Sequence, residues 1–136
     1  MKSSKHKVQY YETDKMGIVH HSNYIRWFEE CRVEAMEEGG LGYDVMEEEG
    51  IICPVKSVSC NYEQATKFGE TVEIQARVEK FNGIRLKIDY QVVEVETGDL
   101  KCTGSSEHCF LDDKGHLLNL KKVSPRFYQL FQEIGN

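Results

Sequence analysis

A change to a two-residue period of apolar and polar residues after Gly50 constrains the fold more than any other feature of the sequence. Successive side chains of a β-strand point to opposite faces, so this pattern predicts strands with one buried and one exposed face. Two alternating segments, 72–79 and 84–92, are separated by Asn82-Gly83. This pair favours a type I′ hairpin turn, in which both turn residues take positive φ. The two segments should therefore be antiparallel neighbours.

Further strands are predicted on both sides of this hairpin. One covers residues 51–64, with Pro54 near its start, and another covers 100–111. Turns at Thr97-Gly98-Asp99 and at 112–115 bound the second of these strands. An apparent strand also leads into Tyr11, so most of the chain should form one antiparallel sheet.

A long helix is predicted over residues 23–38, where apolar side chains recur on one face at helical spacing. Ser22 or Asn23 can cap its start, and Gly39-Gly40 can end it in left-handed geometry. The apolar stripe contains Tyr24, Phe28, Cys31 and Ala35. This stripe is wide enough for the helix to be largely covered.

A short helix over 43–49 and a terminal helix opened by Ser124-Pro125 complete the predicted elements. An apolar sheet face must be covered, and a sheet wrapped around the long helix achieves this within one α+β domain spanning residues 1–136. Open strand edges are commonly hidden by another subunit, so we expect a homodimer.

Composition excludes several classes of protein. The net charge of −6 argues against general nucleic-acid binding, and no apolar run is long enough to span a membrane. Five cysteines without a C-x-x-C pair, and with no apolar leader before them, favour reduced thiols in the cytoplasm. A polyanionic ligand would need a local cationic patch.

The segment from Tyr11 to Tyr24 carries the most suggestive polar residues. Asp14 lies in a loop before a helix start, where free backbone N–H groups carry partial positive charge. Such a pair could attack an activated carbonyl and stabilise the developing oxyanion. The alternative is that Asp14 only forms an Asx turn. Gly17 would satisfy a backbone requirement and allow the loop to approach a ligand closely.

His20 and His21 raise the question of a metal site, because imidazole is a common ligand. Adjacent loop residues rarely direct both rings to one ion, and no third ligand stands at helical spacing, so we expect no metal and no cofactor. One ring should pack on the helix, or His21 should line a substrate pocket at the helix entrance. A serine hydrolase is not supported, since no G-x-S-x-G motif occurs.

The spacing Thr13-Asp14-x-x-Gly17-x-Val19-x-His21-x-Asn23-Tyr24, followed by an aromatic helix, resembles the 4-hydroxybenzoyl-CoA thioesterase family and its Tol–Pal-associated acyl-CoA thioesterases. The resemblance extends over nearly the whole chain in length and element order. It implies a hotdog fold, an antiparallel sheet wrapped around a long central helix. It also implies metal-independent hydrolysis of acyl-CoA to free acid and CoA by dimers or dimer-based tetramers with sites at the subunit interface.

Roles for individual residues also follow from the resemblance. Asp14 matches the catalytic carboxylate, which attacks the thioester or activates water, and the His21 backbone N–H matches the group that polarises the carbonyl. The His21 ring would help shape the acyl pocket. The resemblance places the remaining substrate-binding positions at Gly17, Val19, Asn23, Tyr24 and Trp27.

Binding of the nucleotide is less clearly encoded. Some relatives carry several basic residues between the two central strands, where this chain has Asn82-Gly83-Ile84, with Arg85 and Lys87 just beyond. These two residues are the candidates for phosphate contacts, although ordinary solvated charges explain them equally well. The acyl carrier could be CoA or acyl carrier protein.

Two other functions are open. The first is a hotdog hydroxyacyl-thioester dehydratase, in which the acid would lie on the central helix, at Glu29 or Glu30. The second is a non-catalytic acyl-thioester binding protein.

Overall fold

The two alternating segments form long antiparallel strands, β3 (Thr71–Phe81) and β4 (Arg85–Glu94). The computed structural model describes residues 2–136. Across the ladder Ile74 pairs with Val92 and Ala76 with Tyr90, and all four side chains are buried. The period-two pattern thus correctly predicts both the strands and their buried face.

The type I′ turn predicted at Asn82-Gly83 is wrong. The Asn82 N–H donates to the carbonyl of Arg85 at 3.3 Å, so Gly83 and Ile84 are the turn residues. Gly83 has a φ of 90°, whereas no residue other than glycine takes positive φ in the described chain. This is the pattern of a type II′ turn. The Asn82 side chain accepts hydrogen bonds from the N–H groups of Ile84 and Arg85, both at 2.9 Å. These bonds fix Asn82 as the residue that precedes the central pair of the turn.

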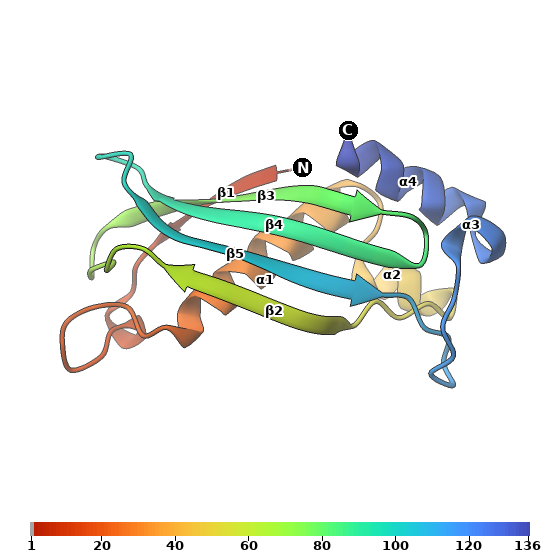
Figure 1. Ribbon diagram of the computed structural model, residues 1–136, viewed down its shortest axis with the longest axis horizontal. Coiled ribbons are helices and arrows are strands. Elements are labelled where there is room, and N and C mark those ends of the chain that lie inside the picture. The colour runs from red at the N-terminus through yellow and green to blue at the C-terminus, as the bar shows by residue number, and fades with distance from the viewer. Residues whose placement is uncertain (1) are drawn as a thin grey trace.

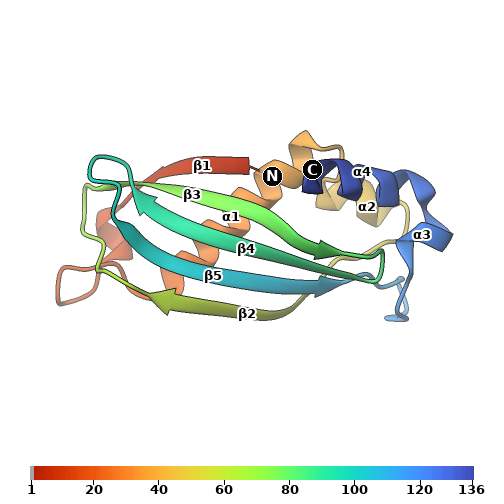
Figure 2. The same ribbon diagram turned by 45° about the horizontal axis from the view of Figure 1, so that its top comes forward.

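Three more strands complete a five-stranded sheet: β1 (Lys2–Lys7), β2 (Val55–Tyr62) and β5 (Leu100–Cys109). The strand order is β1-β3-β4-β5-β2, and every neighbouring pair is antiparallel. Both edges of the sheet, β1 and β2, are therefore unpaired in one chain. The helix α1 (Ser22–Glu38) runs along one face of this sheet (Figures 1 and 2).

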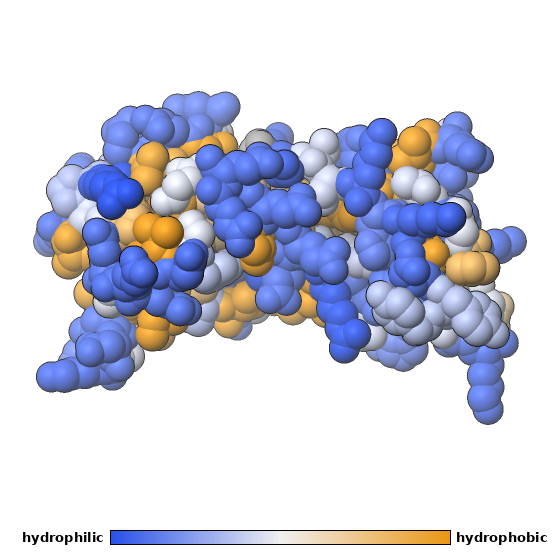
Figure 3. Space-filling model, turned by 180° about the vertical axis from the view of Figure 1, so that it is seen from behind, coloured by the Kyte–Doolittle hydropathy of each residue, from blue (hydrophilic) through white to orange (hydrophobic). Residues whose placement is uncertain are grey.

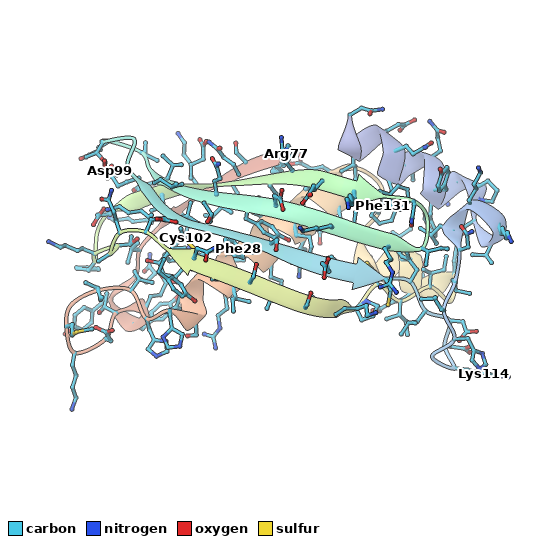
Figure 4. All side chains as sticks on the ribbon, in the orientation of Figure 1. Phe28, Arg77, Asp99, Cys102, Lys114 and Phe131 are labelled. Carbon is cyan, nitrogen blue, oxygen red and sulfur yellow. The ribbon has the colours of Figure 1, made fainter. Side chains whose placement is uncertain are left out.

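The helix α1 supplies the centre of the core. Its buried side chains include Trp27, Phe28, Cys31 and Met36. Phe28, labelled in Figure 4, stacks on Tyr90 of β4 with ring centroids 4.4 Å apart.

The end of α1 differs in detail from the left-handed Gly39-Gly40 pair that we predicted. Gly40 takes a φ of 78°, but Gly39 keeps a φ of −84°. The Leu41 N–H donates to Met36 O at 2.7 Å and the Gly40 N–H donates to Glu37 O at 3.2 Å. These two bonds form a Schellman motif, which needs only one left-handed residue.

Short helices close the two ends of the molecule. These are the 3-10 turn η1 (Tyr10–Glu12), α2 (Tyr43–Glu48), α3 (Leu120–Val123) and α4 (Pro125–Gly135). The predicted cap at Ser124 is confirmed, since its hydroxyl accepts from the Phe127 N–H at 3.3 Å. On α4, Phe131 packs against Phe81 and Phe110 at one end of the sheet (Figure 4).

An antiparallel sheet around a central helix is the α+β hotdog arrangement that the sequence predicts. All five cysteines are free thiols. Within residues 2–136, no helix is long and apolar enough to cross a membrane.

Candidate active site

A tight hairpin presents Asp14 at one end of the sheet. Thr13 pairs with Val19, the Asp14 N–H donates to Ile18 O at 2.8 Å, and the Gly17 N–H donates to Asp14 O at 3.0 Å. Gly17 takes a φ of 78°, as expected for a type I turn followed by a left-handed residue. The backbone requirement predicted for Gly17 is therefore present. A Cβ added there would meet nothing within 4 Å, so one chain alone shows no close approach at this residue.

The Asp14 carboxylate is half-buried, and its two oxygens differ in their contacts. Oδ1 accepts a hydrogen bond from the Met16 N–H at 2.8 Å, which is the Asx turn considered above. Oδ2 accepts no hydrogen bond within residues 2–136. The turn and a chemical role are therefore compatible, because each uses a different oxygen.

The start of α1 lies beside this hairpin. His21 occupies the N-cap, so the caps predicted at Ser22 or Asn23 are wrong. The Asn23 amide is buried and donates to Glu12 O at 2.9 Å, which ties the helix start to the segment that enters the hairpin. The backbone N–H of His21 donates no hydrogen bond within the described chain, so it is free for a ligand.

A cavity of about 270 Å³ joins these two features. Asp14 and His21 line it together with a mostly apolar and aromatic wall. That wall contains Met16, Ile18, Val19, Tyr24, Tyr62 and Ala65. The structure therefore brings Asp14, Val19, His21 and Tyr24 together as predicted from the sequence.

Tyr62 of β2 is a cavity residue that the sequence did not reveal. Its hydroxyl donates to His21 O at 3.2 Å, and its ring lies edge-on to Tyr24 at 5.3 Å. Burial is the largest cause that raises the pKa of Tyr62 to about 12, and the neighbouring Cys60 thiol is the next largest. Burial also raises the pKa of Tyr24, whose hydroxyl donates to Thr66 Oγ1 at 2.9 Å. Both hydroxyls therefore stay protonated near neutral pH.

The two histidine rings stack on each other with centroids 4.2 Å apart, and His21 lines the cavity whereas His20 does not. His20 Nδ1 lies 2.8 Å from the Ser22 hydroxyl. Among residues 2–136, no group of three or more His, Cys, Asp or Glu side chains is arranged to hold a metal ion.

Trp27 does not line the cavity in one chain. Its ring is 1% exposed and lies behind Tyr24, at a centroid distance of 4.9 Å. Its indole N–H donates to Glu12 Oε2 at 2.8 Å. Asn23 is likewise turned toward Glu12 rather than toward the cavity.

Arg85 and Lys87 lie far from Asp14 within one chain. In Figure 1 the red-orange loop of the hairpin is at the left end of the molecule, whereas β4 begins at the right end. There the two residues line a hollow of about 370 Å³ together with Lys56 and Lys80. The sequence did not connect these four cations, since they come from three different strands. Lys87 Nζ also pairs with Glu79 Oε2 at 3.1 Å.

Glu29 and Glu30, the acids considered for a dehydratase, are exposed on α1. Figure 3 views the molecule from the helix side and shows mostly hydrophilic side chains over this face. Neither residue lines the cavity that contains Asp14.

The sequence model of the thioesterase-like superfamily matches residues 8–131. YneP, a candidate acyl-CoA thioesterase of Bacillus subtilis (strain 168), is 29% identical over 128 residues, which cover 93% of this chain and 92% of YneP. The acyl-CoA thioester hydrolase YbgC of Escherichia coli O6:H1 is 23% identical over 90 residues, which cover 66% of this chain and 67% of YbgC.

Solved structures agree with this assignment. The DHNA-CoA thioesterase from Staphylococcus aureus superposes with a TM-score of 0.89 at 32% identity, covering 97% of this chain and 89% of that chain. A family match over most of the chain and a closely similar fold lead to one conclusion: this chain belongs to the thioesterase-like superfamily.

Proposed function

We propose that this protein is an acyl-CoA thioesterase that hydrolyses acyl-CoA to a free acid and CoA. One observation carries the proposal: a carboxylate with a free oxygen, on Asp14, and a free backbone N–H, on His21, line the same cavity at the start of α1. The names of the similar proteins, which are CoA thioesterases and thioester hydrolases, support the same reaction.

The reaction uses the two groups at opposite ends of the thioester carbonyl. The His21 N–H donates to the carbonyl oxygen and stabilises the negative charge that develops there. If Asp14 acts as a base, it takes a proton from water, the water oxygen bonds to the carbonyl carbon, and the C–S bond breaks. The CoA thiolate then takes up the proton. If Asp14 is the nucleophile, it forms an anhydride with the acyl group, which water cleaves in a second step.

The acyl group would lie against the aromatic wall formed by Tyr24, Tyr62 and the His21 ring. Gly17 shapes the hairpin, and Asn23 and Trp27 support the helix start. A closer relationship to the 4-hydroxybenzoyl-CoA thioesterases, including the Tol–Pal-associated type, is also a proposal. It is supported by the motif from Thr13 to Tyr24 and by the similarity to YbgC.

The CoA phosphates would bind in the hollow lined by Lys56, Lys80, Arg85 and Lys87, which concentrates positive charge in an acidic protein. This hollow lies at the other end of the sheet from Asp14, so we propose that it serves the site of a second subunit. Strand β2 is an unpaired edge, exposed along nearly its whole length, and is suited to join two copies in a homodimer. Such dimers could pair further into tetramers.

Two features of the proposal concern the cellular setting. The five free cysteines support a reducing compartment, and we propose the cytoplasm. A basic hollow could also receive an acidic acyl carrier protein in place of the CoA nucleotide.

A substrate panel tests the proposed function. Purified protein is assayed for free thiol release with aliphatic and aromatic acyl-CoA substrates, and with an acyl carrier protein loaded with one of the same acyl groups. We expect hydrolysis of at least one substrate class. Tight binding without thiol release would favour the non-catalytic binding protein, and hydration of an enoyl-CoA would favour the dehydratase.

A further inference from the structure

Glu12 is a buried carboxylate two residues before Asp14, and the thioester-cleaving scheme above gives it no role. It is 5% exposed. Its Oε2 accepts from the Trp27 indole N–H at 2.8 Å, and its Oε1 accepts from the Gln9 backbone N–H at 2.8 Å and from His6 Nε2 at 2.7 Å. Three donors on one buried carboxylate make a rigid anchor.

The backbone of Glu12 is anchored as firmly as its side chain. Its carbonyl oxygen accepts from the His20 N–H at 2.8 Å and from the Asn23 side-chain amide at 2.9 Å. Both donors lie beside His21, at the helix start. Glu12 therefore contacts α1 twice, once through the indole in its core face and once through its first turn.

We propose that Glu12 is a positioning residue that sets the distance and orientation between the Asp14 carboxylate and the His21 N–H. The inference rests on the proposed function, since it presumes that these two groups act together. They belong to different segments, the hairpin and the helix. Glu12 directly precedes the hairpin in the chain and is tied to the helix and its entrance by hydrogen bonds from Trp27, Asn23 and the His20 N–H. Catalytic groups must be held within about 0.5 Å of their working geometry, and a misplacement of about 1 Å can cost 100-fold in rate.

The negative charge of Glu12 is needed for these hydrogen bonds. Burial alone would raise the pKa of this carboxyl, but the hydrogen bonds from His6, the Gln9 N–H and Trp27 together hold it below its ordinary value. The group is therefore ionised at neutral pH and offers only acceptors. Glutamine at this position would have the same shape, but its amide nitrogen would face a donor. At least one of the three hydrogen bonds would then be lost.

A matched pair of variants tests the proposal. Glu12→Gln removes the charge beside α1. Glu94→Gln is the control, because Glu94 is also buried, 4% exposed, and its carboxylate accepts from the Thr97 N–H and hydroxyl at 2.6 and 3.0 Å, with no hydrogen bond to the hairpin or to α1 among the described residues. For both variants we would measure kcat and KM with the best acyl-CoA substrate, the free energy of unfolding, and the emission of Trp27, the only tryptophan in the chain.

We expect Glu12→Gln to lower kcat roughly 10- to 100-fold with KM changed less than about twofold, and to shift the Trp27 emission. Glu94→Gln should lose a similar amount of stability and keep wild-type kcat and emission. Unchanged kcat in Glu12→Gln, or an equal loss of kcat in both variants, would overturn the positioning role.

If Glu12→Gln does not fold, His6→Gln weakens the same anchor from the donor side. A loss of kcat in His6→Gln that is smaller than the one expected for Glu12→Gln, with KM unchanged, then supports the positioning role. A wild-type kcat in His6→Gln overturns it.

Asp14→Asn, assayed alongside, separates this inference from the function on which it rests. If the wild type hydrolyses no acyl thioester in the panel, the proposed function is wrong whatever Glu12 does. If the wild type is active and Asp14→Asn retains turnover, the assignment of Asp14 is wrong and the positioning role loses its premise. If Asp14→Asn is inactive while Glu12→Gln is as fast as wild type, only the positioning role is wrong.

Discussion

At the scale of single residues, the Asp14 carboxylate holds a turn with one oxygen and leaves the other for the chemical role that we propose. Oδ1 holds the turn through the Met16 N–H, and Oδ2 faces no donor in the described chain. The amide of asparagine can keep the first contact, because its oxygen is still an acceptor. It cannot attack a thioester or take a proton from water.

Asp14→Asn should therefore lower kcat on the order of 100-fold or more and leave the free energy of unfolding nearly unchanged. Asp112→Asn is the matched control, since Asp112 Oδ1 also accepts backbone N–H bonds in an exposed turn, from Lys114 and His116. The control should keep full activity. Near wild-type turnover in Asp14→Asn, measured by thiol release, would falsify the assignment of Asp14.

A second feature at this scale is a row of four buried polar side chains that are linked by hydrogen bonds on the inner face of the sheet. Arg32 Nη1 donates to the Tyr90 hydroxyl at 3.0 Å, that hydroxyl lies 2.7 Å from Ser106 Oγ, and Ser106 Oγ lies 2.7 Å from His108 Nε2. Within residues 2–136, His108 Nδ1 makes no hydrogen bond of good geometry. The pKa of His108 is lowered from 6.5 to about 4. Burial is the largest cause, and the positive charge of Arg32 is the next largest. The Pro54 backbone beside the ring opposes this fall in pKa only in part.

His108 should make the fold sensitive to mild acid. Its pKa is lower in the folded than in the unfolded state, so its stability contribution is complete above pH 6.5 and is lost as the pH falls toward 4. The full loss is on the order of 3 kcal/mol. Denaturant unfolding between pH 7.5 and 5 should show this slope in the wild type and a weaker slope in His108→Gln. His116→Gln, at an exposed turn, is the control, and an equal slope in all three proteins would remove His108 from the explanation.

At the scale of elements, α1 lies so close to the sheet that one strand position must be glycine. A Cβ added at Gly104 of β5 would lie 2.4 Å from Ser59 O and 2.5 Å from Phe28 Cε2. The Phe28 ring is itself fixed by stacking on Tyr90. The ring has no free space to move into, because the interior is closely packed.

Gly104→Ala should therefore destabilise the protein by about 1–3 kcal/mol, in spite of the better strand propensity of alanine. Ser105→Ala, one position along on the other face, should change stability by less than about 0.5 kcal/mol. Urea unfolding monitored by Trp27 fluorescence compares the two variants. Equal stability of Gly104→Ala and the wild type would show that α1 can move away from β5 at little cost.

At the scale of the whole molecule, the sheet separates the two candidate binding features. The hairpin that carries Asp14 and the start of β4, which carries Arg85 and Lys87, lie at opposite ends of the molecule (Figures 1 and 2). The first lines the cavity described above, and the second lines the basic hollow. If the hollow holds the CoA phosphates, its charges contribute binding energy without contacting the reacting carbonyl.

Replacing both Arg85 and Lys87 with Gln should then raise KM for acyl-CoA and largely spare kcat, because uniform binding energy is lost. The effect should shrink at high salt, since the Debye length is about 8 Å at physiological ionic strength. A short acyl thioester without the nucleotide is the internal control, and its KM should not change. An equal KM change for both substrates, or none for acyl-CoA, would exclude these residues from phosphate binding.

The proposed dimer makes a further prediction at this scale. Val58 on the unpaired strand β2 is 40% exposed, so Val58→Glu is compatible with the folded chain and should place like charges across a β2–β2 junction. Sedimentation should show dissociation of a dimer, with activity lost in parallel. Val95→Glu is the control, since Val95 is 43% exposed and lies just beyond β4. A Val58→Glu protein that sediments as the wild type does would exclude this edge as the interface.

The sequence by itself determined the elements and their order. Periods of two and 3.6 residues are local signals, and they located β3, β4 and β5, the helix α1 and its buried face. The spacing from Thr13 to Tyr24 also singled out Asp14, Val19, His21 and Tyr24, which the fold gathers around one cavity. They lie close together because a short hairpin and a helix start are adjacent in the chain.

Only the tertiary structure decided the features that depend on distant segments. Tyr62 reaches the cavity from β2, and four cations meet in one hollow from three strands. Trp27 turns its indole toward Glu12, and Gly104 must leave room for Phe28. No local pattern encodes these contacts, because strand order, register and the approach of helix to sheet are set by packing of the whole core.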